Sequence, residues 1–362
     1  MAKVVGIDPG TKTYGIIGLE NGKVILDTSF PTKNIVNQPE LILDTLKSIG
    51  EIDLLVAPSG MGVPMVKIED LNDNYLFEMT LEKKIEGKIT AISKVAKLLK
   101  EAGYRGYFIP GVKHLPTVPD YRKVNKIDLG TADKVCSAIL GIYDQSQKLS
   151  IPYNETSFIL IEMGSGFNAI LGIENGQIVD GIGGTLGGIG FLSCGALDGE
   201  LAYLFGEIKK QFLYQGGAAY IAGYKDLSFE EFEILSKQDD KFRMAYEAFL
   251  DGIIKNVAAI NYSVKKPREI LLSGKLSHFD DIKNRLSTKI SEIAPIRRVK
   301  GLSNVKIAKE AAQGAAIIAD GLIGGQFKEL LEVSRLKEAK GSNLDLIYFK
   351  HIDEIKKEYC RD

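Results

Sequence analysis

The chain lacks several features that would direct a functional reading: it has no tryptophan, three cysteines and three histidines in 362 residues, and almost no net charge. Cys136, Cys194 and Cys360 are odd in number and far apart, which argues against a disulfide framework and favours a reducing, cytoplasmic location. Because 46 basic residues nearly balance 47 acidic ones, we expect no nucleic acid and no membrane as partner. Any anion must therefore be bound by local groups.

Long apolar runs are also missing. The N-terminus reaches Asp8 before a signal-peptide core can develop, so we interpret it as mature structure. The weakly charged stretch 178–197 holds Asp180 and seven glycines, a poor composition for a bilayer helix, and predicts a strand followed by a glycine-rich loop. With 45% hydrophobic and 26% charged residues, the chain can form two domain cores.

An internal repeat organises the chain. The segment GLENGKV at 18–24 recurs as GIENGQI at 172–178, an offset of 154 residues, and the same offset relates Asp8 to Glu162. Asn-Gly between apolar runs favours a β-hairpin, because both turn positions need positive φ. We therefore predict two related domains, each opening with β-hairpins.

An α/β pattern follows each hairpin set. The periodicity predicts strands at 53–57, 106–109 and 269–272, and helices at 39–49, 89–102, 131–147, 199–212, 229–236, 241–264, 279–290 and 308–322. The segment from Phe327 onward reads as a helical tail.

The turn after the first strand of each repeat suits a phosphate. A glycine-bearing turn presents backbone N–H groups without a side chain in the way, while the preceding carboxylate would hold Mg²⁺ rather than touch phosphate. Asp-Pro-Gly alone is common in plain turns, and the repetition at one offset is what favours function. We expect Asp8 and Glu162 to bind the metal, and Asp8 to be a catalytic residue as well. The expected nucleotide-binding residues are Gly10, Thr11, Lys12, Gly164, Ser165 and Gly166.

Four segments carry a resemblance to a known superfamily. Val5 to Gly15 resembles the first phosphate motif of the sugar kinase, actin and Hsp70 superfamily, and Ile161 to Gly166 its second. Ile270 to Lys275 resembles the adenosine motif, and Ala311 to Ala316 the small-residue helix that packs on a counterpart, here the helix from Thr131. Within the superfamily the chain is most similar to the acetate and butyrate kinase branch, and closest to an archaeal family of predicted butyrate kinases.

The resemblance implies an α/β fold of two duplicated actin-like ATPase (ribonuclease H-like) domains, with ATP in the interdomain cleft and ATP and Mg²⁺ as cofactors. It implies that Ser273, Gly274 and Lys275 bind the nucleotide. We expect an N-terminal domain over 1–130, a linking helix over 131–150, a C-terminal domain over 151–326 and a helical tail over 327–362. Relatives in the acetate kinase branch are often dimers, so a homodimer is expected as a partner.

The sequence departs from the superfamily pattern at three points. Glu162 stands where many relatives have Asp, and Ser273-Gly274 replaces the usual double glycine. The histidine and arginine pattern of true acetate kinases is not found, since His114, His278 and His351 are scattered.

The acceptor side has two interpretations. Gly130-Thr-Ala-Asp133-Lys134 resembles the Gly-x-Asp-Arg motif of type III pantothenate kinases, in which the acid contacts the acceptor hydroxyl; Lys134 replaces the arginine. With a hydroxyl acceptor, Asp133 would be the catalytic base and Asp128 its reserve. The alternative is a purely structural role, a capping motif in which Thr131 begins a helix.

A carboxylate acceptor makes the opposite demand. No base is then required, and cations should dominate, so Arg122, Lys123 and Lys126 become the expected substrate-binding residues. The loop holding Gly183, Gly184 and Thr185 is the other expected substrate contact, although its glycines fit tight packing equally well.

The leading hypothesis is an ATP-dependent phosphotransferase that passes the γ-phosphoryl group to a short-chain carboxylate, as in a butyrate kinase. The alternatives are a kinase of a hydroxyl acceptor, pantothenate kinase-like, and a nucleotide-switched binding protein like actin or Hsp70. Acyl transfer to tRNA, known in another branch, uses a His-x-x-x-His site that this sequence lacks.

Overall fold

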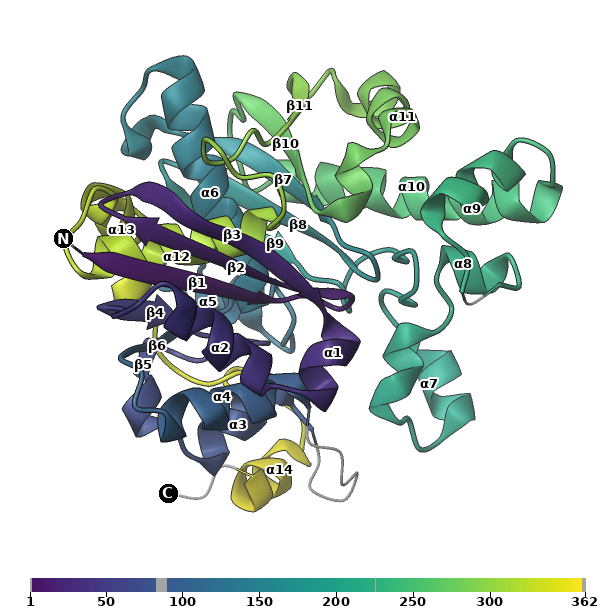
Figure 1. Cartoon of the computed structure of the whole chain (residues 1–362). Helices are drawn as coiled ribbons and strands as arrows, with labels where there is room; N and C mark the ends of the chain where they lie inside the picture. Colours follow the sequence, from purple (N-terminus) through teal and green to yellow (C-terminus); the bar gives the residue numbers. More distant parts are fainter. Residues whose placement is uncertain (1, 83–89, 225, 360–362) are drawn as a thin grey trace. The chain divides into compact units, whose positions relative to one another are not determined.

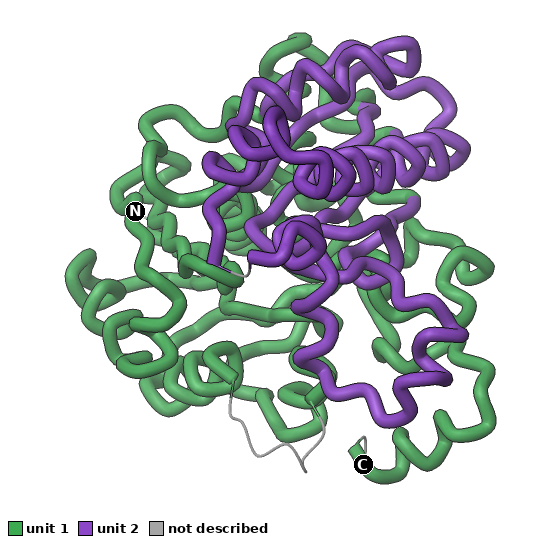
Figure 2. The backbone as a smooth tube through the Cα atoms, turned by 90° about the vertical axis from the view of Figure 1, so that its right-hand side faces the viewer, with its two compact units in different colours: residues 1–156, 175–179, 299–362 green, residues 157–174, 180–298 purple. Residues whose placement is uncertain are grey.

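The computed structural model describes residues 2–82, 90–224 and 226–359 and is of mixed α/β type (Figure 1). Two compact units divide it (Figure 2). Unit 1 comprises 1–156, 175–179 and 299–362, and unit 2 comprises 157–174 and 180–298. This division differs from the expected boundaries, because the helix over 132–149 and the chain after 298 both lie in unit 1.

Unit 1 is built on a six-stranded sheet in the order β3-β2-β1-β4-β6-β5. The first three strands, β1 Lys3–Pro9, β2 Thr13–Glu20 and β3 Lys23–Pro31, are antiparallel neighbours. Strands β4 Leu54–Val56 and β6 Gly106–Phe108 run parallel to β1, and β5 Val66–Lys67 closes the edge. Strand β5 was not predicted, because two residues carry no periodicity.

The helices of unit 1 confirm most of the predicted segments and add short ones. They are α1 Thr32–Asn37, α2 Glu40–Ser48, α3 Asp73–Thr80, α4 Ala91–Glu101, α5 Asp120–Lys123, α6 Ala132–Leu149, α12 Glu310–Leu322, α13 Lys328–Ser334 and α14 Ile352–Tyr359. The start of the helix predicted over 89–102 falls on Ile89, which lies outside the described residues.

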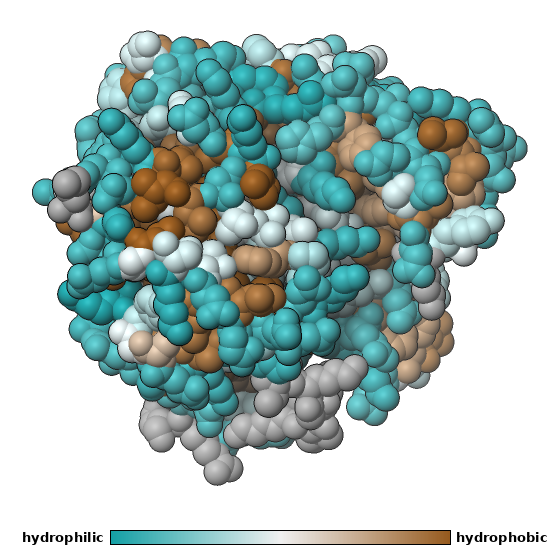
Figure 3. Space-filling view, viewed as in Figure 1, coloured by the Kyte–Doolittle hydropathy of each residue, from teal (hydrophilic) through white to brown (hydrophobic). Residues whose placement is uncertain are grey.

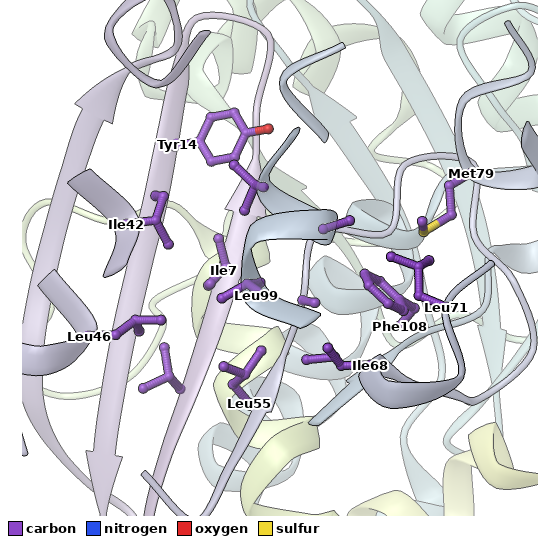
Figure 4. Close-up of a cluster of buried hydrophobic side chains, with 14 of the residues drawn as sticks. Ile7, Tyr14, Ile42, Leu46, Leu55, Ile68, Leu71, Met79, Leu99 and Phe108 are labelled. Carbon is purple, nitrogen blue, oxygen red and sulfur yellow. The ribbon is translucent and has the colours of Figure 1, made fainter. Parts of the chain in front are cut away.

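The two faces of β1 meet different partners because alternate residues of a strand point to opposite sides. Val5 and Ile7 are buried in a core cluster with residues of α2 and α4 (Figure 4). Gly6, between them, faces α12: a methyl group there would lie 2.2 Å from the Ala316 nitrogen. Glycine is therefore required at this position by the close approach of helix and sheet.

Helix α12 packs on the sheet with one side and on α6 with the other. A methyl group at Gly314 would lie 1.9 Å from the carbonyl oxygen of Cys136 in α6, so the two helix backbones are in near contact. The predicted packing of the small-residue helix against the helix from Thr131 is confirmed.

Unit 2 repeats the arrangement with five strands in the order β11-β10-β7-β8-β9. These are β7 Phe158–Met163, β8 Asn168–Glu174, β9 Gln177–Ile182, β10 Glu269–Ser273 and β11 Ile296–Arg298. The hairpins match in register: Asp8 pairs with Gly15, and Glu162 with Ala169, each shifted by the offset of the sequence repeat. Both Asn-Gly turns have positive φ, at Asn21 and at Asn175.

The helices of unit 2 are α7 Gly199–Phe205, α8 Ala218–Ile221, α9 Phe229–Ser236, α10 Asp240–Asn261 and α11 Asp280–Ile290. The helix predicted over 199–212 is shorter than expected, since Gly206 adopts positive φ and ends α7. Helix α7 exposes Leu201, Tyr203, Leu204 and Phe205. Brown surface is visible where Figure 1 places α7 (Figure 3).

The tail from Phe327 is only partly helical, and its last part is fastened to unit 1. Buried Asn343 donates hydrogen bonds to the carbonyl oxygens of Gly62 and Glu78, each 3.0 Å long. The Glu78 carboxylate accepts in turn from the Ser342 hydroxyl and the Asn343 N–H, and the Tyr359 ring stacks on Phe77. We call residues 339–359 the C-terminal strap.

The described residues contain no helix with both the length and the apolar character needed to cross a bilayer. The stretch 178–197 is, as predicted, a strand followed by a loop.

Candidate functional site

A small recess in unit 1 brings together two of the expected catalytic residues. It lies where β1 and β4 end and α6 begins. Its walls are formed by Ile7, Asp8, Pro9, Val56, Ala57, Ser59, Ile109, Ala132, Asp133, Cys136 and Ala311. Asp8 and Asp133 therefore share one recess although 125 residues separate them in the sequence.

The turn after Asp8 is tight and anchored. A methyl group at Gly10 would lie 2.6 Å from the Thr13 carbonyl oxygen, which explains the glycine. Thr32 fixes the turn, since its hydroxyl donates to the Gly10 carbonyl at 2.7 Å and its N–H to the Lys12 carbonyl at 2.9 Å. Asp8 is buried, whereas Thr11 and Lys12 are exposed. The turn thus offers open backbone beside a buried carboxylate.

The Asp133 carboxylate lies in the first turn of α6 and is held by its neighbours. It accepts hydrogen bonds from the Thr131 hydroxyl and from the Lys134 ammonium. Burial raises the pKa of Asp133, but the Lys134 charge and these hydrogen bonds outweigh it and hold the pKa below its usual value. Thr131 is the N-cap residue of α6, yet its hydroxyl donates to the Asp133 carboxylate and accepts from no backbone N–H, so the alternative of a side-chain capping motif is not formed.

Cys136 follows one turn later on α6 and faces the same recess. Burial raises the pKa of its thiol well above the usual value, and the charges of Asp133 and Asp8 add to the effect. The thiol is therefore neutral at physiological pH.

The other acceptor-side candidates are not in this recess. Asp128 is buried in the preceding loop and is absent from the lining. Arg122 donates to the Val179 carbonyl in β9 at 2.7 Å, and Lys123 to the Leu115 carbonyl at 2.9 Å. Lys126 is exposed. The expected role of these cations at a carboxylate acceptor stays a prediction.

In unit 2, the Glu162 carboxylate lies close to both the second phosphate turn and the adenosine motif. A methyl group at Gly274, whose φ is +82°, would lie 2.6 Å from one Glu162 carboxylate oxygen. At Gly164 the same oxygen would be 3.7 Å away. Ser273 pairs with Glu162 across the parallel strands β10 and β7, while Lys275 is exposed. The carboxylate thus lies between two glycine turns that are 110 residues apart in sequence.

The turn Gly164–Gly166 is supported by the glycine-rich loop. The Gly166 carbonyl oxygen accepts hydrogen bonds from the N–H groups of Leu192 and Ser193, both 3.1 Å long. A methyl group at Gly184 would lie 2.7 Å from the Phe167 side chain, so this glycine is needed for packing. Ser165 is buried in the same turn. The packing interpretation is therefore supported for Gly184, which lies against the residue that follows the phosphate turn.

Both turns fit a metal-bound phosphate in the chemistry of their donors. Each offers one carboxylate beside open glycine backbone, which suits Mg²⁺, an ion that takes oxygen ligands and keeps several waters. Within the part of the chain that the structure describes, no three side chains of His, Cys, Asp or Glu converge into a closed metal cage. A metal held by Asp8 or Glu162 would need water and phosphate oxygens to complete its coordination.

Two residues near Asp8 were missed by the sequence reasoning. Ser59 lines the recess and accepts a hydrogen bond from the Ile109 N–H at 2.9 Å. Lys309 places its ammonium 3.0 Å from the position of a methyl group at Gly10. The sequence feature that could have indicated Lys309 is its place at the start of the small-residue helix, where Ser, Thr, Asp or Asn is usual.

Comparisons with known proteins agree with this architecture. The family model described as "Protein of unknown function (DUF1464)" matches residues 6–349, and the chain belongs to this family. A search of curated protein sequences finds no match.

Among solved structures, the chain resembles a propionate kinase from Francisella tularensis subsp. tularensis SCHU S4. The TM-score is 0.62 at 12% identity, over 87% of this chain and 98% of that one. The acetate kinase from Entamoeba histolytica gives a TM-score of 0.59 at 13% identity, over 80% and 87% of the two chains. The acetate kinase from Porphyromonas gingivalis gives 0.56 at 17% identity, over 81% and 88%. The chain thus has the two-domain actin-like fold of these kinases, which confirms the predicted fold class.

Proposed function

We propose that this member of the DUF1464 family is an ATP-dependent kinase of a small molecule. The observation that carries the proposal is the matched pair of turns: Asp8 and Glu162 end equivalent strands in equivalent registers, and each is followed by open glycine backbone. A hairpin with a purely structural role would not need to repeat a buried carboxylate in this way. Phosphoryl transfer requires little from a protein beyond positioning and charge stabilisation, which these turns can supply.

The turns at Gly10 and Gly164 would bind phosphate oxygens through backbone N–H groups. The turn at Gly274 would approach the adenosine, and Lys275 and Ser273 flank it. Asp8 and Glu162 would hold Mg²⁺, which when bound neutralises phosphate charge and orients the transferred group.

For the acceptor, the recess favours a hydroxyl. Asp133 and Asp8 share it, and its lining contains no lysine or arginine. In this version the acceptor O–H proton passes to Asp133 while the acceptor oxygen bonds to the γ-phosphorus and the bond to ADP breaks. Because the pKa of Asp133 is held low, the carboxylate is ionised at neutral pH and can accept the hydrogen bond that orients the hydroxyl.

A short-chain carboxylate is the second candidate, and the fold supports it. The acetate and propionate kinases that the chain resembles act, by their names, on such acids. An anionic acceptor placed beside Asp8 and Asp133 would be repelled unless cations intervened. Arg122 and Lys123 donate to backbone carbonyls, so Lys126 is the expected cation for which no such contact is described.

The experiment is a screen of the purified protein with ATP and Mg²⁺ against short-chain carboxylates and pantothenate-like alcohols, with products identified by mass. A phosphate ester whose formation is lost in Asp133→Asn supports the hydroxyl version. An acyl phosphate, trapped as its hydroxamate and still formed by Asp133→Asn, supports the carboxylate version. ATP hydrolysis with no phosphorylated product from any acceptor would favour a nucleotide-switched binding protein instead.

A further inference from the structure

A lysine from the far end of the chain reaches the first phosphate turn. The point where a methyl group would stand at Gly10 is 3.0 Å from the Lys309 ammonium nitrogen and 3.5 Å from a carboxylate oxygen of Asp8. All three residues belong to unit 1. The Lys309 ammonium and the Asp8 carboxylate therefore both lie close to the Gly10 turn, where the Thr13 carbonyl oxygen is 2.6 Å from the same point.

Helix stability does not explain this lysine. Lys309 is the N-cap residue that precedes α12, and its side chain makes no capping hydrogen bond. A cation at the N-terminus of a helix opposes the helix dipole, and a small polar residue would stabilise the helix better. Among the described residues, the Lys309 side chain has no observed hydrogen bond or ion pair. A lysine at the N-cap is unfavourable for the helix, and no contact of its side chain offsets this cost. Such an exception is typical of a functional position.

The backbone before Lys309 is held in place from the sheet. The Asp27 carboxylate, on β3, accepts hydrogen bonds from the N–H groups of Lys306, Ile307 and Ala308 at 2.7, 2.9 and 2.7 Å. Three charge-assisted bonds to consecutive N–H groups fix this segment firmly. Lys309 is the next residue, so Asp27 sets the position from which its side chain extends towards Gly10.

The charges around the lysine also suit a metal-bound phosphate. Asp8 faces it across Gly10, and Glu310 is its neighbour at the start of α12. Lys12 lies in the turn itself and is exposed, whereas Lys309 is partly buried. A partly buried ammonium interacts more strongly with phosphate than an exposed one, because solvent screens it less.

We propose that Lys309 binds the phosphate chain of the nucleotide at the Gly10 turn, and that Asp27 is the positioning residue for it. This inference rests on the proposed function and names a binding residue for the same site. The ammonium would contribute to ground-state binding of the β- and γ-phosphates and to stabilising the transferred group. Lys12, the cation expected from the sequence, then contributes less.

The test compares nucleotide binding in the full chain. Titration calorimetry with Mg²⁺-ATP, adenosine and Mg²⁺-tripolyphosphate is run on the wild type, Lys309→Met, Lys309→Arg, Asp27→Asn and, for comparison, Lys12→Met, which should weaken ATP binding less than Lys309→Met does. We expect Lys309→Met to weaken ATP and tripolyphosphate binding about tenfold or more, since loss of one phosphate contact costs about 1.4 kcal/mol or more. Adenosine binding should stay within about twofold, and Lys309→Arg should recover part of the loss.

The proposed function and this inference fail in different ways. If the wild type binds ATP and Lys309→Met binds it equally well, the role of Lys309 is overturned while the kinase proposal stands. If the wild type forms no phosphorylated product but binds tripolyphosphate through Lys309, the binding site is upheld and the kinase proposal is not. If the wild type binds neither ATP nor tripolyphosphate, both are overturned. Asp27→Asn should lower ATP affinity with Lys309 intact, and unchanged affinity would remove its positioning role.

Discussion

Asp8 and Glu162 hold the same place in two hairpins of the same register, each as the partner of a small residue on the neighbouring strand, Gly15 and Ala169. Each carboxylate is buried beside a glycine turn. They differ in what surrounds them: Asp8 shares its recess with Asp133, whereas Glu162 lies against the Gly274 turn. The duplication therefore gives two related turns whose carboxylates have different neighbours: the proposed acceptor recess for Asp8 and the proposed adenosine turn for Glu162.

Exchange of Gly314 for alanine should destabilise unit 1. The new methyl group would lie 1.9 Å from the Cys136 carbonyl oxygen, so α12 and α6 must separate. Overpacking of this kind costs about 1–3 kcal/mol. Chemical unfolding followed by circular dichroism measures the change. Gly199→Ala is the matched control, since nothing lies within 4 Å of a methyl group there; an equal loss in both variants would contradict the explanation.

His114 should make the protein sensitive to acid. Burial lowers the pKa of this histidine from 6.5 to about 4, so the folded protein keeps it neutral. Below pH 6.5 the unfolded chain binds a proton that the folded one does not, and the free energy of unfolding falls as the pH drops from 6.5 towards 4. The loss attributable to His114 is at most ~3 kcal/mol.

Unfolding measured at a series of pH values should show this slope in the wild type and a reduced one in His114→Gln. The charges of Lys113, Lys123 and Asp345 also affect the pKa of His114, so these residues are not mutated in the experiment. The same slope in both proteins would exclude His114 as its source.

Lys134→Met should shift the pH dependence of the reaction with a hydroxyl acceptor. Without the ammonium, burial dominates and the pKa of Asp133 rises. Activity needs the ionised carboxylate, so the acid limb of the kcat profile should move to higher pH. An unmoved acid limb, with a reduced kcat at every pH, would mean that Lys134 acts otherwise than through Asp133.

Asn343→Ala should loosen the C-terminal strap. Its loss leaves the buried carbonyls of Gly62 and Glu78 without the two donors, at a cost of about 1–3 kcal/mol. Limited proteolysis should then cleave the strap faster, as judged by mass spectrometry. Tyr348→Ala is the control, because that side chain is 69% exposed and its removal should change stability by less than about 0.5 kcal/mol.

The local parts of the fold could be read from the sequence. Asn-Gly turns, apolar strands and the alanine-rich helix each carry their signal within a few residues, and the repeat fixed the equivalence of Asp8 and Glu162. Short elements such as β5, α1 and β11 were missed because two to six residues are too few to show a repeating pattern. They exist because neighbouring elements pack on them.

The candidate site was predictable only where its residues lie inside a motif. Asp133 was found through its motif and does share the recess with Asp8. Arg122 and Lys123 looked like ligands because charge alone was visible, but they bind the carbonyl oxygens of Val179 and Leu115. Lys309 was missed because only the folded chain brings it to Gly10.

The central claim is that Asp8 serves phosphoryl transfer to an acceptor. The most direct measurement is the yield of phosphorylated acceptor, identified by mass, from Mg²⁺-ATP and the best acceptor of the screen, compared between the wild type and Asp8→Asn at equal folded fractions. We predict product from the wild type and a rate lower by about a hundredfold or more in Asp8→Asn. Equal rates in the two proteins would contradict the account.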